Sequence, residues 1–385
     1  MGGKVSVLLG TTKGVFVLDS DEDRGDWRVR GPFCDGWSIN HVIGDAGSGT
    51  IWAAGGGEWT GAGVWRSEDG GETWTLSKLA NGKFDAFIAN DPEFAAYIGR
   101  QADPPAPFTG KVDALWSLGM AGDTLLAGAK PAALYASTDR GASWAPLDGL
   151  TDHPSAPEWQ PGGAGLVLHT ILADPEAPEK LWVGISAAGV FASEDSGATW
   201  ERRNRLSNLG AEHSAHVHVD SRHSHDIGHC VHNLVRASGD LLYQQNHHGV
   251  FRSPDGGRSW DGITAGLPSD FGFPIAVHPR DPQSVWVLPL NGDMAGRYPP
   301  DASAAVWRSR NGGESWEAMR DGLPGQSCFF TVLRQAMATD RATPAGVYFG
   351  TNSGSVFAST DEGDHWEEIA RHLPTVLSVE VLQRA

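Results

Sequence analysis

Residues 67–74 read SEDGGETW, and this stretch carries the pattern Ser-x-Asp-x-Gly-x-(Ser/Thr)-Trp that indicates the fold. The pattern recurs along the chain at intervals of 50–70 residues. Further copies start at Ser137, Ser193, Ser253, Ser309 and Ser359. In the last two copies, respectively, Asn311 replaces the aspartate and His365 replaces the hydroxyl residue. A short motif repeated at such a period is typical of a fold that stacks copies of one supersecondary unit.

Each copy is expected to form the turn between two antiparallel strands. The aspartate side chain can accept hydrogen bonds from backbone N–H groups across the turn. The glycine supplies a positive φ, and the tryptophan folds back as an apolar plug. Residues 20–27 form a shortened seventh copy in which Asp23, Gly25 and Trp27 keep the order. Because the aspartate recurs in every unit, we interpret it as part of the turn rather than as a catalytic residue.

Three apolar segments with strand character precede each copy, and a fourth follows its tryptophan. In one unit the first three occupy residues 38–45, 50–56 and 63–67. Seven such four-stranded units predict an all-β, seven-bladed β-propeller. Residues 5–20 match the second and third strands of a unit and residues 375–382 match the first, so the terminal strands are expected to pair and close the ring. We predict one propeller domain over residues 1–385.

The composition excludes several classes of partner. The chain has 385 residues, 47 acidic and 29 basic, and a formal net charge of −18. This balance argues against nucleic acid, which proteins bind by neutralising phosphates. The three cysteines form no CxxC pair and fit reduced thiols. No run of about 18 apolar residues and no signal peptide is evident. We therefore predict a cytoplasmic protein without a membrane partner.

The repeated motif resembles the Asp-box, or BNR, repeat of sialidases, and the whole chain is similar to intracellular bacterial proteins described as sialidase-like or glycosyl-hydrolase-like. This resemblance implies a propeller that binds and hydrolyses a small polar substrate such as a sugar. The sialidase active site itself is not matched. Residues 29–33 are a poor match to the family's Arg-Ile-Pro-type motif, Arg334 is the one arginine expected on an inner strand, and Tyr243 is the one tyrosine near the expected ligand face.

Large insertions point to one face of the propeller. They occur at residues 79–111, 149–165 and 204–228, in connections between successive blades. Loops carried by a rigid scaffold often hold functional residues. We expect one register of the inner strands to line the mouth of the central channel. The aligned residues are His41, Trp116, His169, His232, Pro274, Arg334 and Ser378 or a neighbour of it.

Polar residues at the ends of the second strands extend this predicted site. Unpaired buried polar groups cost about 1–3 kcal/mol each, so the polar run at residues 243–248 is expected to face a ligand. We predict that a small molecule or glycan is bound by His41, Trp116, Gln245, Asn246, His247 and Asp293. The predicted catalytic residues are His169 and His232, one of which would act as general base or metal ligand, and Arg334, which would pair with an anionic group. A glycosidase needs two carboxylates, but spacing selects no pair from Glu58, Asp91, Glu93, Asp113, Asp270 and Asp293.

Two alternative hypotheses remain open at this point. Nine of the fifteen histidines lie between His213 and His248, and imidazole clusters bind divalent transition metals. A metal-dependent hydrolase or lyase would use His169, His232 and His247 as ligands. The second alternative is a propeller without enzymatic activity that serves as an interaction or assembly module. The sequence does not decide among the three hypotheses.

Overall fold

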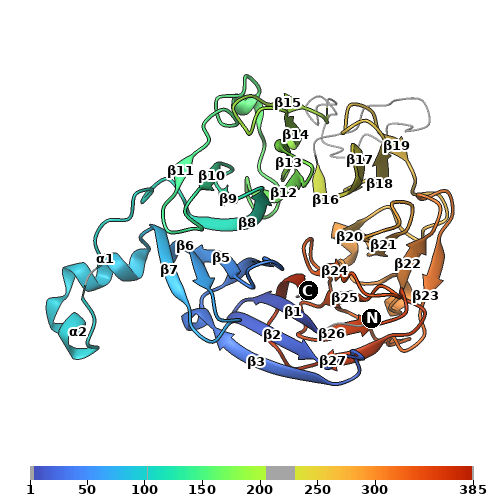
Figure 1. The fold of residues 1–385 in the computed structure, drawn as a ribbon, viewed down its shortest axis with the longest axis horizontal. Helices are drawn as coiled ribbons and strands as arrows, with labels where there is room; N and C mark the ends of the chain where they lie inside the picture. The colour runs from blue at the N-terminus through green and yellow to red at the C-terminus, as the bar shows by residue number, and fades with distance from the viewer. Residues whose placement is uncertain (1–3, 102, 205–229, 384–385) are drawn as a thin grey trace.

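The computed structural model describes residues 4–101, 103–204 and 230–383. Within these residues the chain forms seven four-stranded antiparallel sheets arranged as a ring around a central axis, which confirms the predicted seven-bladed β-propeller (Figure 1). One sheet contains β28 (Val376–Gln383), β1 (Val5–Thr11), β2 (Gly14–Ser20) and β3 (Trp27–Phe33). β28 pairs antiparallel with β1, so the two ends of the chain close the ring as predicted.

The other six sheets each contain four consecutive strands. They are β4 (Ile39–Gly44), β5 (Ile51–Gly57), β6 (Gly61–Ser67) and β7 (Thr75–Ala80); β8 (Ala114–Ala121), β9 (Thr124–Lys130), β10 (Leu134–Ser137) and β11 (Ala145–Pro146); β12 (Leu168–Asp174), β13 (Ala177–Ile185), β14 (Gly189–Ser193) and β15 (Glu201–Arg202); β16 (Val231–Ser238), β17 (Leu241–Asn246), β18 (Gly249–Ser253) and β19 (Asp261–Gly262); β20 (Gly272–Val277), β21 (Val285–Pro289), β22 (Val306–Ser309) and β23 (Glu317–Met319); β24 (Met337–Thr339), β25 (Val347–Gly350), β26 (Val356–Ser359) and β27 (Glu367–Ala370).

The predicted turn is present in each copy of the motif. In residues 67–74 the Asp69 carboxylate accepts hydrogen bonds from the backbone N–H of Thr73 at 2.9 Å and from its hydroxyl at 2.5 Å. Ser67 Oγ donates to Asp69 and accepts from the N–H of Gly71, whose φ is +93°. Trp74 Nε1 donates to the Gly71 carbonyl oxygen at 3.0 Å. The hydrogen bonds from Thr73 hold the pKa of Asp69 well below its usual range.

The shortened seventh copy forms the same kind of turn with a different aspartate. Asp21, rather than Asp23, accepts the backbone N–H of Gly25 at 2.9 Å. Trp27 Nε1 donates to the Arg24 carbonyl oxygen at 3.2 Å, as the tryptophan does in the full copy at residues 67–74. The predicted turn is therefore present over the same eight positions, but its accepting aspartate lies one position earlier than in residues 67–74.

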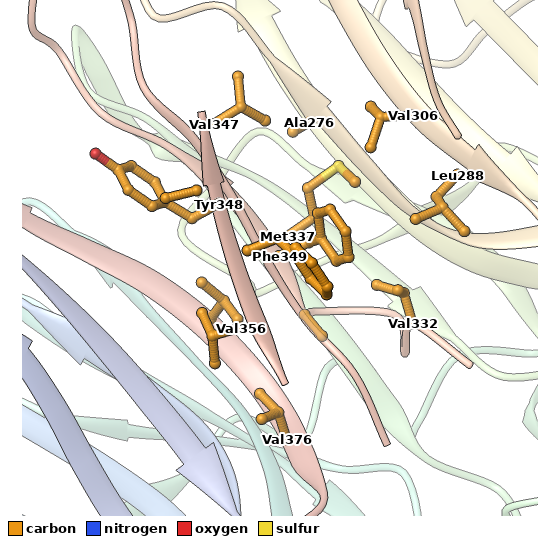
Figure 2. Close-up of a cluster of buried hydrophobic side chains, with 14 of the residues drawn as sticks. Ala276, Leu288, Val306, Val332, Met337, Val347, Tyr348, Phe349, Val356 and Val376 are labelled. Carbon is orange, nitrogen blue, oxygen red and sulfur yellow. The ribbon is translucent and has the colours of Figure 1, made fainter. Parts of the chain in front are cut away.

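Neighbouring sheets are joined by apolar packing and by tryptophan hydrogen bonds. Leu288 and Val306 of one sheet pack against Met337 and Phe349 of the next in a continuous buried cluster (Figure 2). Tryptophans on three second strands also donate their Nε1–H to a motif turn of the following sheet. The pairs are Trp52 with the Arg140 carbonyl, Trp182 with the Gly256 carbonyl and Trp286 with the Glu362 carbonyl, at 2.9–3.0 Å.

The first large insertion folds into two short helices at the outer edge of the ring. They are α1 (Lys83–Asn90) and α2 (Pro92–Tyr97), and they lie beyond β7, away from the central axis (Figure 1). The insertion at 204–228 lies almost entirely outside the described residues. No helix among the described residues is both long enough and apolar enough to cross a lipid bilayer.

Candidate functional site

The inner strands share a β-bulge close to one end. The strand pairing skips one residue in β4, β8, β12 and β16 and two in β20, and it skips one in β28 opposite β1. The skipped residues are Asn40, Trp116, His169, His232, Phe273 with Pro274, and Leu377. A bulge bends its strand and redirects a side chain. Because of this extra residue, Asn40 and Phe273 line the central cavity where the alignment predicted His41 and Pro274, and Leu377, the neighbour of Ser378, lines it as well.

This central cavity has a volume of about 640 Å³ and is lined by strand residues of five of the seven sheets and by connecting loops. The bulged residues contribute one part of its wall, and residues 160–164 of the second large insertion contribute another. A third part comes from the connections between second and third strands, with Ser186, His247, Asp293 and Arg297. Asp293 and Arg297 lie in the connection at residues 290–305, which is much longer than its counterparts in the other sheets. Large insertions are therefore not confined to the blade-to-blade connections.

Arg334 and Arg297 give one side of the cavity its positive charge. Their guanidinium carbons lie 5.4 and 5.6 Å from the centre of the Phe273 ring. Arg297 Nε donates to Asp293 Oδ1 at 2.6 Å, so this pair is nearly neutral. Burial lowers the pKa of Arg334 to about 10, which leaves the guanidinium protonated at neutral pH.

Arg334, which is half-buried at the cavity wall, differs from other arginines of the protein interior in its lack of a partner. No described residue forms an ion pair or a side-chain hydrogen bond with it, and its Nε is buried without a hydrogen-bond acceptor. In contrast, Arg24, Arg236 and Arg308 each lie 2.7 Å from a carboxylate oxygen. Arg334 therefore has unused capacity for an anion in the cavity.

Cys230, His232 and His247 form a second polar cluster in the same cavity. Their ligand atoms all lie within 4.8 Å of one another, and Cys230 Sγ is 3.9 Å from His232 Nε2. The rings of His232 and His247 are 5.3 Å apart. Burial lowers the pKa of His232 well below its usual range and raises the pKa of the Cys230 thiol to about 11, against the opposing effect of nearby Arg334.

Two of the predicted site histidines are held inside the protein and do not line the cavity. His169 is fully buried, with Nδ1 2.8 Å from the Thr170 hydroxyl and Nε2 3.1 Å from the Val231 carbonyl oxygen. His41 Nδ1 accepts the backbone N–H of Leu118 at 2.9 Å. Burial lowers the pKa of His169 well below its usual range. The contacts of both residues join neighbouring sheets.

Gln245 and Asn246, at the polar end of β17, form hydrogen bonds within the protein. Gln245 Nε2 donates to the carbonyl oxygens of Asn246, Gly249 and Asp270 at 2.9–3.2 Å. Asn246 Nδ2 lies 3.3 Å from Gln244 Oε1. Neither Gln245 nor Asn246 lines the cavity, whereas His247, the next residue, does. The predicted residues that the fold brings together there are Trp116, His232, His247, Asp293 and Arg334.

The cavity offers a single carboxylate among the described residues. Of the acidic candidates, Asp293 lines it. Asp91 instead caps α2 by accepting the Phe94 N–H at 2.9 Å, and Glu58 pairs with Lys83 beside α1. Hydrolysis of a glycosidic bond by two carboxylates requires a second such group about 5–9.5 Å away. The described residues do not supply one in this cavity.

Sequence reasoning missed Cys230, Arg297, Asn40 and Phe273. Two of them had a usable signal. Cys230 stands two residues before His232, a spacing that places both on one side of a strand. Arg297 lies in the polar stretch after a second strand that is too long for a simple hairpin. Asn40 and Phe273 reach the cavity because of bulges, which carry no clear mark in the sequence.

Comparison with known proteins shows likeness of fold at low sequence identity. No protein-family model and no curated protein matches the chain. A GH74 xyloglucanase from Xanthomonas campestris is 17% identical with a TM-score of 0.62, covering 96% of this chain and 55% of the enzyme. This chain thus spans about half the length of that enzyme. YCF48 bound to D1 peptide is 15% identical with a TM-score of 0.51, covering 96% and 84%.

A third similar structure matches over nearly the full length of both chains. It is a 6-phosphogluconolactonase-like propeller from Bacteroides fragilis, 11% identical with a TM-score of 0.55, covering 99% of this chain and 98% of the other. At such identities the similarity concerns the fold alone. The chain is a seven-bladed β-propeller with structural neighbours among GH74 glycoside hydrolases, YCF48 and lactonase-like propellers.

Proposed function

We propose that the central cavity binds a small anionic sugar derivative and that Arg334 pairs with its carboxylate or phosphate group. The observation that carries the proposal is the absence of any described ion-pair partner for Arg334 in a cavity of ligand size. A buried charge is costly unless it is paired. A guanidinium presents a planar fork of donors that matches carboxylate and phosphate oxygens. A ligand anion therefore supplies the partner that the protein does not.

The rest of the cavity wall suits the neutral part of a sugar. Trp116 is half-buried at its bulge, and an aromatic ring of this kind can cover the apolar face of a sugar ring. The amide nitrogens of Asn40 and Gln335 donate to the carbonyl oxygens of Leu115 and His169. These bonds fix both side chains and leave their amide oxygens as acceptors for hydroxyl groups.

The similar structures are consistent with this class of ligand. The names of two of them denote action on a glycan and on a phosphorylated sugar lactone. The recurring turn motif supports a place in the Asp-box, sialidase-like group. Because Asp293 is the one carboxylate among the described residues of the cavity, we propose binding and not a two-carboxylate glycosidase mechanism.

Calorimetric titration of the full chain tests the proposal. The ligands are glucuronate, 6-phosphogluconate and glucose, and binding of at least one anionic sugar over glucose is expected. Hydrogen bonds to charged groups contribute about 1.5–3 kcal/mol, so Arg334→Met is expected to weaken anion binding about 10- to 150-fold. Arg310→Met, which alters an exposed ion pair elsewhere, is the control. Equal affinity of the Arg334→Met variant, or no preference for an anionic sugar, would contradict the proposal.

A further inference from the structure

We infer that Cys230, His232 and His247 bind one zinc(II) ion in the wall of the central cavity. Among the described residues, these three are the one group of His, Cys, Asp or Glu whose ligand atoms come within 4.8 Å of one another. A thiolate with two imidazoles is a ligand set that suits zinc. The cluster differs from the predicted set of three histidines because His169 uses both ring nitrogens within the protein.

The spacing of the three ligand atoms is close to that of a tetrahedral zinc site. Zn–S and Zn–N bonds of about 2.3 and 2.0–2.1 Å, separated by a tetrahedral angle, place sulfur and nitrogen about 3.6 Å apart. Cys230 Sγ and His232 Nε2 are 3.9 Å apart. The separations of these two atoms from the ring nitrogen of His247 are at most 4.8 Å.

The hydrogen bond at the far side of the His232 ring prepares it as a ligand. His232 Nδ1 donates to the carbonyl oxygen of Gly272 at 2.6 Å. This bond fixes the tautomer in which Nε2 carries the lone pair, and Nε2 is the nitrogen that faces Cys230. Metal-binding histidines commonly donate their other ring N–H to a carbonyl or carboxylate in this way.

The backbone holds the three ligands on two paired strands. Cys230 directly precedes β16 and His247 directly follows β17, and Val231 is paired with Asn246 between them. The backbone N–H of His247 donates to the Cys230 carbonyl oxygen at 3.2 Å. Cys230 and His232 are two residues apart and so project to one side. The ligand set is therefore held by sheet structure.

Three protein ligands leave one position of a tetrahedral ion open, and all three line the cavity. Open positions of this kind are typical of catalytic zinc, which polarises oxygen atoms or ionises a bound water. If the proposed function is correct, an anionic sugar paired with Arg334 would direct another of its oxygens toward the ion. Zinc binding itself does not depend on that function.

Zinc titration of chelator-treated full-length protein tests the inference. We expect one equivalent of Zn²⁺ to bind, measured by competition with a chromophoric chelator and by elemental analysis. Loss of even an outer-shell partner costs about 10- to 100-fold in metal affinity. Cys230→Ser and His247→Asn are therefore each expected to weaken binding by at least about 100-fold. Cys328→Ser and His153→Asn, matched substitutions away from the cavity, are expected to leave it unchanged.

A spectroscopic measurement identifies the ligands independently. Co²⁺ in place of zinc is expected to show a thiolate charge-transfer band that Cys230→Ser removes, with circular dichroism confirming that the variant is folded. Zinc affinity that is unchanged in Cys230→Ser and His247→Asn would overturn the inference and indicate binding by the histidines at 213–229. Arg334→Met is expected to lose sugar binding but keep zinc, so the two proposals can fail separately.

Discussion

Replacing Arg24 by methionine is expected to destabilise the packing of the sheet of β28, β1, β2 and β3 against the neighbouring sheet of β24–β27. Arg24 lies in the β2–β3 turn, and its Nη1 is 2.7 Å from Asp340 Oδ2, with both side chains almost fully buried. Its Nη2 donates to the carbonyl oxygens of Pro344 and Thr360. The Tyr348 hydroxyl donates to the same Asp340 oxygen at 2.7 Å. Arg24→Met would therefore leave a buried carboxylate without its cation.

The size of the effect follows from the burial of this pair. Removing one partner of a buried ion pair costs about 3–5 kcal/mol, because the other charge remains uncompensated. Unfolding entropy of about 2.1 cal/mol/K per residue gives about 0.8 kcal/mol/K for a chain of 385 residues. The midpoint of thermal unfolding is therefore expected to fall by about 4–6 °C, as measured by scanning calorimetry. The exposed pair Arg371–Glu368 supplies the control, since Arg371→Met should cost at most about 1 kcal/mol.

A second substitution separates the charge effect from loss of packing. Adding Asp340→Asn to Arg24→Met removes the uncompensated carboxylate, so the double variant is expected to be more stable than Arg24→Met alone. An Arg24→Met variant that melts within about 1 °C of the parent would refute the reasoning. A double variant less stable than Arg24→Met would show that the loss does not come from the buried charge.

Three further outcomes are expected. The lowered pKa of Asp69 means that the stability which its carboxylate gives the folded protein is complete above about pH 4 and is lost on acidification. Asp69→Asn is therefore expected to reduce the fall in melting temperature between pH 5 and pH 2. A fall equal to that of the parent would contradict this. Asp321 raises the pKa of His365 above 6.5, so the stability that this pair gives the folded protein is present below that pH and is lost as pH rises. An NMR titration is expected to show a lower His365 pKa in Asp321→Asn than in the parent. Trp182→Phe leaves the Gly256 carbonyl without its donor and should cost about 1–3 kcal/mol, read as a lower melting temperature than the parent's.

The repeated motif was enough to predict the architecture, because its chemistry is local. The serine, aspartate, glycine and tryptophan of residues 67–74 contact one another within eight positions, so their order along the chain already specifies the turn. The number of copies and the unpaired terminal strands then predicted seven sheets and a closed ring. Local hydrogen bonds and strand alternation do not depend on the rest of the fold. Features that these two effects determine can therefore be predicted from the sequence.

The composition of the cavity was predictable only in part. Alignment of the inner strands and second-strand ends pointed to Trp116, His232, His247, Asp293 and Arg334, and the structure brings these five together in the cavity wall. Gln245 was predicted to face a ligand because it is polar on a buried strand. It instead donates to three carbonyl oxygens of the protein. Whether a buried polar group serves a ligand or the backbone depends on the distances around it, which a sequence does not contain.

The sequence by itself determined the repeat unit and the seven-sheet ring, and it marked the polar residues that could lie near the channel. Only the tertiary structure decided which of them meet in one cavity. A bulge of one residue exchanged His41 for Asn40 at the wall, since each added residue reverses the side to which the following side chain points. The pairing of β16 with β17 brought Cys230 beside His247, and the absence of a described carboxylate partner distinguished Arg334 from Arg24, Arg236 and Arg308.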